Sequence, residues 1–316
     1  MNEDLTPATE RTFYFVGVTT GKSSIMRVFP AWAKHLGLDA VIRGIDCAWH
    51  DDPERYRAVV SFIKNDPLSL GALVTTHKID LLDASRELFD GLGRHAELLG
   101  EVSSISKRDG ELWGHAKDPV TSGLSLEAFL PEDHWRRSGG ALCLLGAGGS
   151  SLALTTYCME ELPEGNRPSR IVVTNRSAPR LDAMRTVHEK INPGIAVEYH
   201  HCPEPGQNDA VVSGLPPGSV VANATGLGKD APGSPLTSAA RFPERGYAWD
   251  FNYRGDLLFI DQARAQQEER GLHVEDGWTY FIHGWTRVIA EVFHRDIPTS
   301  GPEFDELSRI AAEARR

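Results

Sequence analysis

The sequence has few cysteines, no long apolar run and no histidine pair at metal-ligand spacing. Its four cysteines are far apart in 316 residues, so we expect buried free thiols and not disulfides or metal ligands. No apolar stretch reaches the length of a membrane span and no signal peptide is recognisable, so we expect a cytoplasmic protein. The twelve histidines include no His-x-x-x-His pair beside a carboxylate. This disfavours a metal hydrolase, and we expect no bound metal.

Basic residues are scarce relative to acidic ones. The chain carries 33 Lys and Arg against 44 Asp and Glu, which gives a net charge of −11. Such a surface disfavours nucleic acid and anionic membranes as partners, although it is compatible with a local basic pocket. With 41% hydrophobic residues and no visible repeat or low-complexity segment, the chain is long enough for two globular domains.

The first third of the chain alternates between strand-like and helix-like patterns. Dense apolar runs predict strands, and apolar residues at helical spacing predict helices. The expected strands lie at residues 13–18, 40–45 and 72–74, and the expected helices at 25–36, 53–63 and 79–99. This alternation predicts an α/β fold with an open, mostly parallel sheet.

Polar clusters follow the strands of this first part. Open α/β sheets bind their ligands at the carboxyl ends of the strands, which makes these clusters candidate ligand-binding groups. The clusters are Lys22-Ser23-Ser24, Thr75 to Lys78, Ser103-Ser104 and Gly114 to Asp118. Turn-forming residues between 131 and 140 then mark a domain boundary, so we expect one domain at 1–130 and another at 131–277.

A glycine-rich turn begins the second domain. The apolar residues 142–145 run into Gly146, Gly148 and Gly149, and helical spacing follows. A strand, a tight turn and a helix start in this order allow backbone N–H groups and the helix dipole to meet a pyrophosphate. The third position of the dinucleotide pattern is Ser151 instead of Gly or Ala. We predict a Rossmann dinucleotide-binding domain.

The next expected strand, residues 171–174, ends in Asn175, Arg176 and Ser177. An acidic residue at this point of the fold would select a ribose 2′-hydroxyl, whereas Arg176 and Arg180 can pair with a 2′-phosphate. We therefore predict NADP as the cofactor. The alternative is an ordinary βαβ unit with a solvated arginine pair.

Further elements are expected in the rest of the chain. Strands are predicted at residues 195–200, 209–212, 220–222 and 249–253, and helices at 257–270 and 278–293. The aromatic residues of the last helix are explained by core packing.

Four motifs, in their order and spacing, resemble the shikimate dehydrogenase family over nearly the full chain. They are Gly146-Ala147-Gly148-Gly149, Asn175-Arg176-Ser177 with Arg180, Asn223-Ala224-Thr225 and Asp250-Phe251-Asn252-Tyr253. The resemblance implies a substrate-binding domain first, a Rossmann NADP domain second, and a C-terminal helical segment, residues 278–316, that returns to the first. It also implies the reversible, NADPH-dependent reduction of the cyclic ketone 3-dehydroshikimate to its alcohol.

By this resemblance, Lys78 and Asp118 occupy the family's catalytic positions. As hydride leaves a secondary alcohol its hydroxyl proton must be taken up, which suits a lysine of lowered pKa or a Lys and carboxylate pair. The alternatives are an exposed lysine at a helix start and a helix-capping aspartate. Candidate substrate-binding residues are Lys22, Ser24, Thr75, Ser103, Tyr253 and His283. Candidate cofactor-binding residues are Gly146, Ala147, Gly148, Gly149, Ser150, Asn175, Arg176, Ser177, Arg180, Asn223, Ala224, Thr225 and Gly277.

The sequence departs from the family mainly in the substrate pocket. The family's Ser-x-Ser-Pro loop reads Lys22 to Ile25, and its Asn-Val-Thr-x-Pro-x-Lys run is one residue shorter here and lacks the Asn and the Pro. The usual Gln of the last helix falls at Gly284, or at His283. Losing amides that hydrogen-bond hydroxyls should change which ring is accepted. The added Lys22 and Lys117 are either point charges for an anionic substrate or solvated surface charges.

Two other functions stay open at this point. One is a paralogous cyclitol dehydrogenase that acts on quinate, an aminoshikimate or a similar ring. The other is a non-catalytic NADP-binding protein, against which the presence of both Lys78 and Asp118 argues. We expect a small cyclic polyol acid as the substrate partner and a monomer or homodimer.

Overall fold

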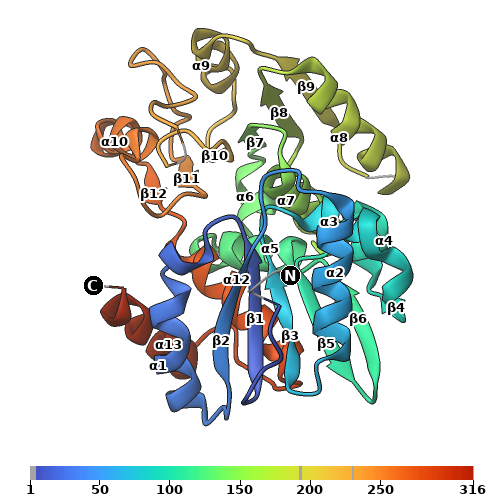
Figure 1. The fold of residues 1–316 in the computed structure, drawn as a ribbon. Helices are drawn as coiled ribbons and strands as arrows, with labels where there is room; N and C mark the ends of the chain where they lie inside the picture. Colours follow the sequence, from blue (N-terminus) through green and yellow to red (C-terminus); the bar gives the residue numbers. More distant parts are fainter. Residues whose placement is uncertain (1–4, 192–193, 230, 316) are drawn as a thin grey trace. The chain divides into compact units, whose positions relative to one another are not determined.

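The computed structural model describes residues 5–191, 194–229 and 231–315. The chain divides into two compact units (Figure 1). Unit 1 comprises the residues up to Lys117 together with those from Ile282 onward, and unit 2 comprises Asp118–Phe281. This division differs from the boundaries expected at residues 130 and 277, because the helix that begins at Asp118 packs on a helix of unit 2.

Unit 1 contains a six-stranded sheet with the order β2-β1-β3-β5-β6-β4. Its strands are β1 (Thr12–Gly17), β2 (Val41–Asp46), β3 (Ser69–Val74), β4 (Gly91–Leu92), β5 (Ser104–Arg108) and β6 (Glu111–His115). The pairs β1–β2, β1–β3 and β4–β6 are parallel, whereas β5 runs antiparallel to both β3 and β6. The predicted open and mostly parallel sheet is confirmed, with an antiparallel hairpin of β5 and β6 that the sequence patterns did not predict.

Helices cover both faces of this sheet. They are α1 (Ile25–Leu36), α2 (Pro53–Asn65), α3 (Lys78–Ser85), α4 (Arg94–Leu99), most of α12 (Trp278–Val292) and α13 (Pro302–Ala314), with short 3-10 turns η1 (Thr20–Lys22) and η2 (Arg86–Leu88). Alternate residues of β1 point to opposite faces. Tyr14 packs in the core cluster formed with α2 and α3, whereas Phe13 contacts Phe29 of α1 and Trp285 of α12. The strand is therefore buried on both faces.

The helix expected at residues 79–99 is not continuous. The structure has α3, η2, the short strand β4 and then α4 in this range. Gly91 and Gly93 interrupt the helical pattern, and a Cβ at Gly91 would overlap the ring of Trp113 on the paired strand β6. This close approach of backbone to an aromatic ring explains the break.

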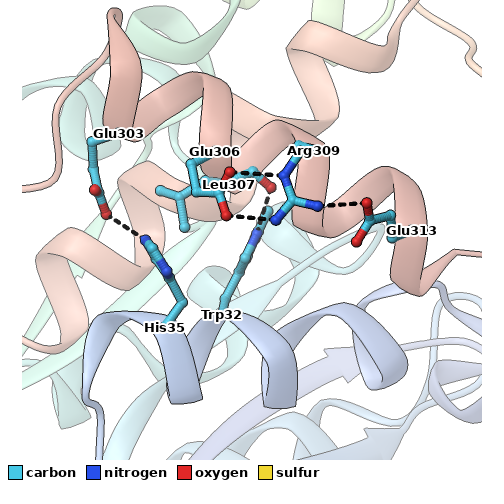
Figure 2. Close-up of polar contacts among 7 residues, drawn as sticks. All are labelled: Trp32, His35, Glu303, Glu306, Leu307, Arg309 and Glu313. Atoms are coloured by element: carbon cyan, nitrogen blue, oxygen red, sulfur yellow. Dashed lines mark hydrogen bonds and ion pairs between the residues drawn. The ribbon is translucent and has the colours of Figure 1, made fainter.

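The chain's last helix, α13, packs on α1 within unit 1 (Figure 2). The indole Nε1 of Trp32 donates a hydrogen bond of 2.8 Å to the backbone carbonyl of Leu307, and both side chains are fully buried. One turn further along α1, His35 lies 2.9 Å from Glu303 in a more exposed ion pair. The buried hydrogen bond should contribute more to stability than the exposed pair.

We expect Trp32→Phe to lower the free energy of unfolding by about 1–3 kcal/mol, because it removes the buried indole hydrogen bond to the Leu307 carbonyl and leaves part of the indole volume unfilled. The matched change His35→Gln should lower it by about 0–1 kcal/mol, since exposed ion pairs contribute little. Urea titration of both variants measures the two costs. Equal costs would contradict the assignment of the indole hydrogen bond as the main polar contact between α1 and α13.

Unit 2 contains a fully parallel sheet with the order β12-β11-β10-β7-β8-β9. Its strands are β7 (Leu142–Leu145), β8 (Ile171–Asn175), β9 (Val197–His201), β10 (Val220–Asn223), β11 (Tyr247–Asp250) and β12 (His273–Glu275). Its helices are α5 (Asp118–Phe129), α6 (His134–Ser138), α7 (Gly149–Glu160), α8 (Ala178–Ile191), α9 (Pro205–Ser213), α10 (Leu258–Arg264) and α11 (Gln267–Arg270), with the 3-10 turn η3 (Glu164–Asn166). Numbered within the unit, the strand order is 3-2-1-4-5-6, the order of a Rossmann sheet. The predicted α/β fold with a Rossmann domain is confirmed.

Three expected elements of unit 2 differ in the structure. The strand expected at residues 209–212 is wrong, because this segment lies in the helix α9, which begins with Pro205 and a capping box between Glu204 and Gln207. The helix expected at 257–270 is divided into α10 and α11, and the strand expected at 249–253 ends at Asp250.

The cysteines follow the sequence-based expectation. All four cysteines are buried and free. Among the helices of the described residues, none combines the length and the apolar character needed to cross a bilayer.

Candidate functional site

The glycine turn of unit 2 joins the carboxyl end of β7 to the first turn of α7. Gly146 has a φ of 111°, and a Cβ there would lie 3.0 Å from the carbonyl oxygen of Ala224, so only glycine suits this position. A Cβ at Gly148 would meet nothing within 4 Å. Open space before the free N–H groups of a twelve-residue helix fits the pyrophosphate of a dinucleotide.

Ser151 explains the departure from the usual dinucleotide pattern. Its hydroxyl is fully buried and donates a 2.5 Å hydrogen bond to the carbonyl of Gly146. The side chain therefore fixes the turn on its inner side, away from the open space at Gly148. Ala147 is also buried, while Ser150 is half-buried in the first turn of α7.

The segment after β8 lies beside the glycine turn, because β7 and β8 are neighbouring parallel strands. The amide of Asn175 donates to the carbonyl of Ser177 at 3.2 Å, and His201 of β9 lies 3.1 Å from the carbonyl of Arg176. Arg176 and Arg180 are both exposed. Two exposed guanidinium groups on a backbone held in this way suit a phosphate monoester.

The segment after β10 is held by a buried hydrogen-bond network. Asn223 donates from Nδ2 to Asp250 at 3.0 Å and accepts at Oδ1 from the Thr225 hydroxyl at 2.6 Å. Asn252 donates from its backbone N–H to Asp250 at 2.8 Å and from Nδ2 to the Thr225 carbonyl at 3.2 Å. Asp250 and Asn252 were not among the predicted site residues. The network fixes the loop that contains Ala224 and Thr225.

Gly277 and Tyr253 lie next to this network. The N–H of Gly277 donates to the carbonyl of Asn252 at 3.0 Å, and a Cβ at Gly277 would overlap the carbonyl of Phe251. The ring of Tyr253 packs 4.9 Å from that of Phe281. Gly277 is thus required for backbone packing after β11, and Tyr253 is held by an aromatic contact.

These segments follow four adjacent parallel strands in the order β8, β7, β10 and β11. Parallel strands end at the same edge of a sheet, so the glycine turn, the arginine segment and the Asn223 network share one edge of unit 2. The edge presents backbone N–H groups at one position and paired cations at the next. This arrangement can hold an elongated anionic ligand with two phosphate sites.

Burial raises the pKa of Asp250 to about 6, against the hydrogen bonds from Asn252 and Asn223, which lower it. The folded protein therefore keeps this proton up to about pH 6, whereas an unfolded aspartate releases it near pH 4. The resulting stabilisation is present at low pH and is lost as the pH rises from about 4 to 6.

We compare the free energy of unfolding of the wild type with that of Asp250→Asn. We expect the difference, wild type minus variant, to fall by roughly 2 kcal/mol between pH 4 and pH 7. Urea unfolding of both proteins at the two pH values measures this change. Asp261→Asn, which alters an exposed carboxylate of the same unit, serves as the control and should show a smaller change. A pH-independent difference for Asp250→Asn would contradict the raised pKa.

In unit 1, the predicted residues near β1 and β3 follow two neighbouring strands. Lys22 is exposed in η1, and Ser24 is half-buried just before α1. Thr75 follows β3 and donates its N–H to the carbonyl of Val16 at 3.0 Å. Lys78 is the first residue of α3. The parallel pairing of β1 and β3 brings these segments to one edge of the unit 1 sheet.

Ser103 connects the β5–β6 hairpin to the segment before Asp118. Its buried hydroxyl accepts a 2.8 Å hydrogen bond from the N–H of Lys117 and lies 3.4 Å from the carbonyl of His115. Asp118 is the first residue of α5, and its carbonyl accepts from the Ser122 hydroxyl at 2.7 Å. The division between the units falls between Lys117 and Asp118, so the two catalytic candidates Lys78 and Asp118 lie in different units.

The structure places Lys117 in an ion pair, which differs from both expected alternatives, a solvated surface charge and a point charge for an anionic substrate. Its ammonium lies 2.5 Å from Glu291 of α12, and the other oxygen of Glu291 lies 3.2 Å from His115. The three side chains are half-buried, so this ion pair is shielded from solvent. Glu291 is 174 residues away in sequence, which explains why the pairing was not predicted.

His283 of α12 is buried, with its ring stacked 4.4 Å from Phe304. Its Nδ1 has no hydrogen-bond partner among the described residues. Burial, reinforced by Arg287, lowers the pKa of His283 to about 4, so the imidazole is neutral at pH 7. At Gly284, the other candidate for the family's Gln position, a Cβ would meet nothing within 4 Å. A neutral imidazole can donate or accept a hydrogen bond where the family has an amide.

Comparison with known proteins agrees with this architecture. No family model matches the chain. It is 28% identical over 182 residues to the shikimate dehydrogenase (NADP(+)) of Streptococcus thermophilus, a match that spans 57% of this chain and 59% of that protein, less than two thirds of its length. It is 24% identical over 232 residues to the enzyme of the same name from Lactococcus lactis, with 72% and 76% of the two chains covered.

Solved structures match over almost the whole chain. Shikimate dehydrogenase from Aquifex aeolicus has a TM-score of 0.72 at 18% identity, with 98% of this chain and 99% of that chain covered. Shikimate 5-dehydrogenase from Thermus thermophilus in complex with NADP(H) and shikimate has a TM-score of 0.69 at 21% identity, with 96% and 99% covered. Quinate dehydrogenase from Corynebacterium glutamicum in complex with NAD has a TM-score of 0.71 at 19% identity, with 96% and 99% covered. In sequence the chain is similar to curated shikimate dehydrogenases, and in fold it is similar to solved shikimate and quinate dehydrogenases.

Proposed function

We propose that this protein is an NADP-dependent oxidoreductase that transfers hydride reversibly between NADPH and a cyclic keto or hydroxy acid, such as 3-dehydroshikimate and shikimate. The observation that carries the proposal is the edge of unit 2, where a glycine turn and an exposed arginine pair follow adjacent parallel strands. The names of the relatives, shikimate dehydrogenase (NADP(+)), support the same reaction.

The cofactor would be held by the residues at this edge. Gly146, Ala147, Gly148, Gly149 and Ser150 would contact its pyrophosphate through backbone N–H groups. Asn175, Arg176, Ser177 and Arg180 would hold the adenosine ribose and its 2′-phosphate, and Asn223, Ala224, Thr225 and Gly277 would line the rest of the site. When bound, the reduced cofactor NADPH would supply the hydride and the oxidised form would accept it.

Proton transfer is assigned to Lys78. During oxidation of the alcohol, the amine of Lys78 takes the hydroxyl proton as the C–H bond breaks, and during reduction the ammonium returns a proton to the forming alkoxide. Asp118 is proposed to bind a ring hydroxyl of the substrate through its carboxylate. Lys22, Ser24, Thr75, Ser103, Tyr253 and His283 are proposed to bind the ring and its carboxylate.

A related ring acid is the second candidate substrate. Lys117 is held by Glu291, and His283, a neutral and buried imidazole, is one of the two candidates for the family's Gln position. A substrate hydroxyl that loses its partner in such a pocket costs about 1–3 kcal/mol. Quinate or an aminoshikimate is therefore the alternative. We further propose a cytoplasmic enzyme that acts as a monomer or a homodimer.

A screen of ring acids tests the proposed reaction. Shikimate, quinate and related cyclic polyol acids are each incubated with NADP or NAD, and the absorbance of the reduced nicotinamide is followed. We expect turnover of at least one ring acid with NADP. A kcat/KM for shikimate of roughly 10⁴ M⁻¹s⁻¹ or more would favour shikimate over the alternative rings. Absence of turnover with every ring and both cofactors would contradict the proposal.

We expect NADP to bind more tightly than NAD, and Arg176→Ala to narrow this gap. Removing one of two guanidinium groups that face a phosphate should weaken NADP binding by about tenfold or more, while NAD binding changes little. Titration of the protein's tryptophan fluorescence with each cofactor measures both affinities. Arg185→Ala, which removes an exposed arginine of α8 that pairs with Asp182, is the control. Equal affinities for the two cofactors in the wild type would refute the arginine assignment.

A further inference from the structure

The three residues before α3 form a tight turn with a strained centre. The N–H of His77 donates a 2.7 Å hydrogen bond to the carbonyl of Thr75, two residues earlier, which closes a γ-turn around Thr76. Thr76 has a φ of 68°. This left-handed conformation is rare for a β-branched residue, and Thr76 is exposed, so its own side chain contributes no burial that would offset the strain.

Both ends of this turn are fixed by other groups. On one side, Thr75 donates its N–H to Val16 of β1 at 3.0 Å, and Val74 donates to Ser103 at 2.9 Å. On the other side, the carbonyl of His77 accepts the N–H of Leu81 at 2.8 Å in the first turn of α3. The backbone at Thr76 is therefore held between a central strand and a helix.

The side chain of His77 is the anchor of the turn. It is 1% exposed, and its Nδ1 lies 3.0 Å from the hydroxyl of Tyr56 on α2. Burial lowers the pKa of His77, so the ring is neutral at pH 7 and can accept a hydrogen bond from the hydroxyl. Because Lys78 is the next residue, the position of this ring determines where the lysine side chain leaves the backbone.

The Tyr56 hydroxyl also holds a second loop. It accepts the N–H of Asp51 at 3.0 Å and lies 3.4 Å from the carbonyl of Ala48, both in the loop between β2 and α2. That loop contacts α3 again, where His50 lies 2.8 Å from Asp80. One buried hydroxyl thus joins the loop after β2 to the turn after β3.

We propose that Tyr56 and His77 are positioning residues for Lys78, and that they hold the strained turn at Thr76 in the geometry that the proton transfer requires. The proposal rests on the function assigned to Lys78 above. Misplacing a proton-transfer group by about 1 Å can reduce the rate by about a hundredfold, so a fixed turn has a direct kinetic consequence.

Tyr56→Phe tests the hydroxyl in the full-length protein. It removes only the hydroxyl, and we expect kcat to fall roughly tenfold while KM and cofactor affinity stay within about twofold. Tyr14→Phe is the matched control, because it removes another buried hydroxyl of unit 1, bound to Asp66 at 3.0 Å. A purely structural role for Tyr56 would lower stability in both variants and leave kcat unchanged in both, which would overturn the proposal.

Thr76→Gly tests the strained turn at an exposed position, where folding is not at risk. Glycine accepts the left-handed conformation without strain, so the midpoint of thermal unfolding should stay the same or rise. The turn also becomes more flexible, so we expect kcat to fall several-fold. Asp109→Gly is the control, because Asp109 has a φ of 53° in the exposed turn between β5 and β6. An unchanged kcat in Thr76→Gly would contradict the role of the turn.

A chemical measurement separates this inference from the proposed reaction. The rate at which an amine-specific reagent modifies Lys78 is followed by peptide mass spectrometry, with Lys64 as the internal reference. Tyr56→Phe should change the Lys78 rate several-fold relative to Lys64, whether or not a ring acid is turned over. Unchanged Lys78 reactivity would overturn the positioning role, whereas changed reactivity without turnover in the screen would contradict only the proposed reaction.

Discussion

Parallel pairing of strands is the constraint on which the candidate site depends. In unit 2 every strand pair is parallel, so each strand delivers its following segment to the same edge of the sheet. Gly146 and Asn223 are far apart in sequence, yet this pairing makes them neighbours. No side-chain contact between them is required. In unit 1 the same pairing joins the ends of β1 and β3. Side chains then act on a geometry that the backbone has already determined.

Buried polar groups hold the loops at both edges. In unit 2 the carboxyl of Asp250 receives hydrogen bonds from Asn223 and Asn252, and in unit 1 the Tyr56 hydroxyl meets His77 and the N–H of Asp51. Burying such groups costs free energy unless their partners are in place. Each network therefore favours one loop conformation strongly over others, which a set of apolar contacts would not do.

The sequence allowed the fold to be predicted where its patterns are local. The run from Leu142 to Gly149 predicts a strand, a turn and a helix, and the structure has all three. A strand was predicted around Val211 and Val212, but this segment lies in the helix α9. A short apolar run is compatible with either element, and here the capping residues favour the helix. The break at Gly91 depends on Trp113, which a local pattern does not reveal.

The candidate site shows the same contrast. The glycines and arginines at strand ends were predicted, because they lie at a fixed spacing from a predicted strand and this spacing is typical of ligand-binding residues. The pairing of Lys117 with Glu291 and the contact between Tyr56 and His77 join segments that are distant in sequence, so no spacing rule reports them. The roles proposed for Lys78 and Asp118 rest on the resemblance to the shikimate dehydrogenases, because the residue types alone do not indicate them.

The return of the chain to unit 1 has a consequence for synthesis on the ribosome. Trp285 packs against Phe13 and Phe15 of the first strand, and Leu307 accepts the hydrogen bond of Trp32. All of unit 2 is translated between these partners, so the nucleotide-binding unit can fold while one face of the unit 1 sheet still lacks its cover. During that interval Phe13 and Phe15 of β1 lack their contacts with Trp285. An unfinished unit 1 of this kind leaves apolar surface uncovered until the segment from Ile282 onward has been synthesised.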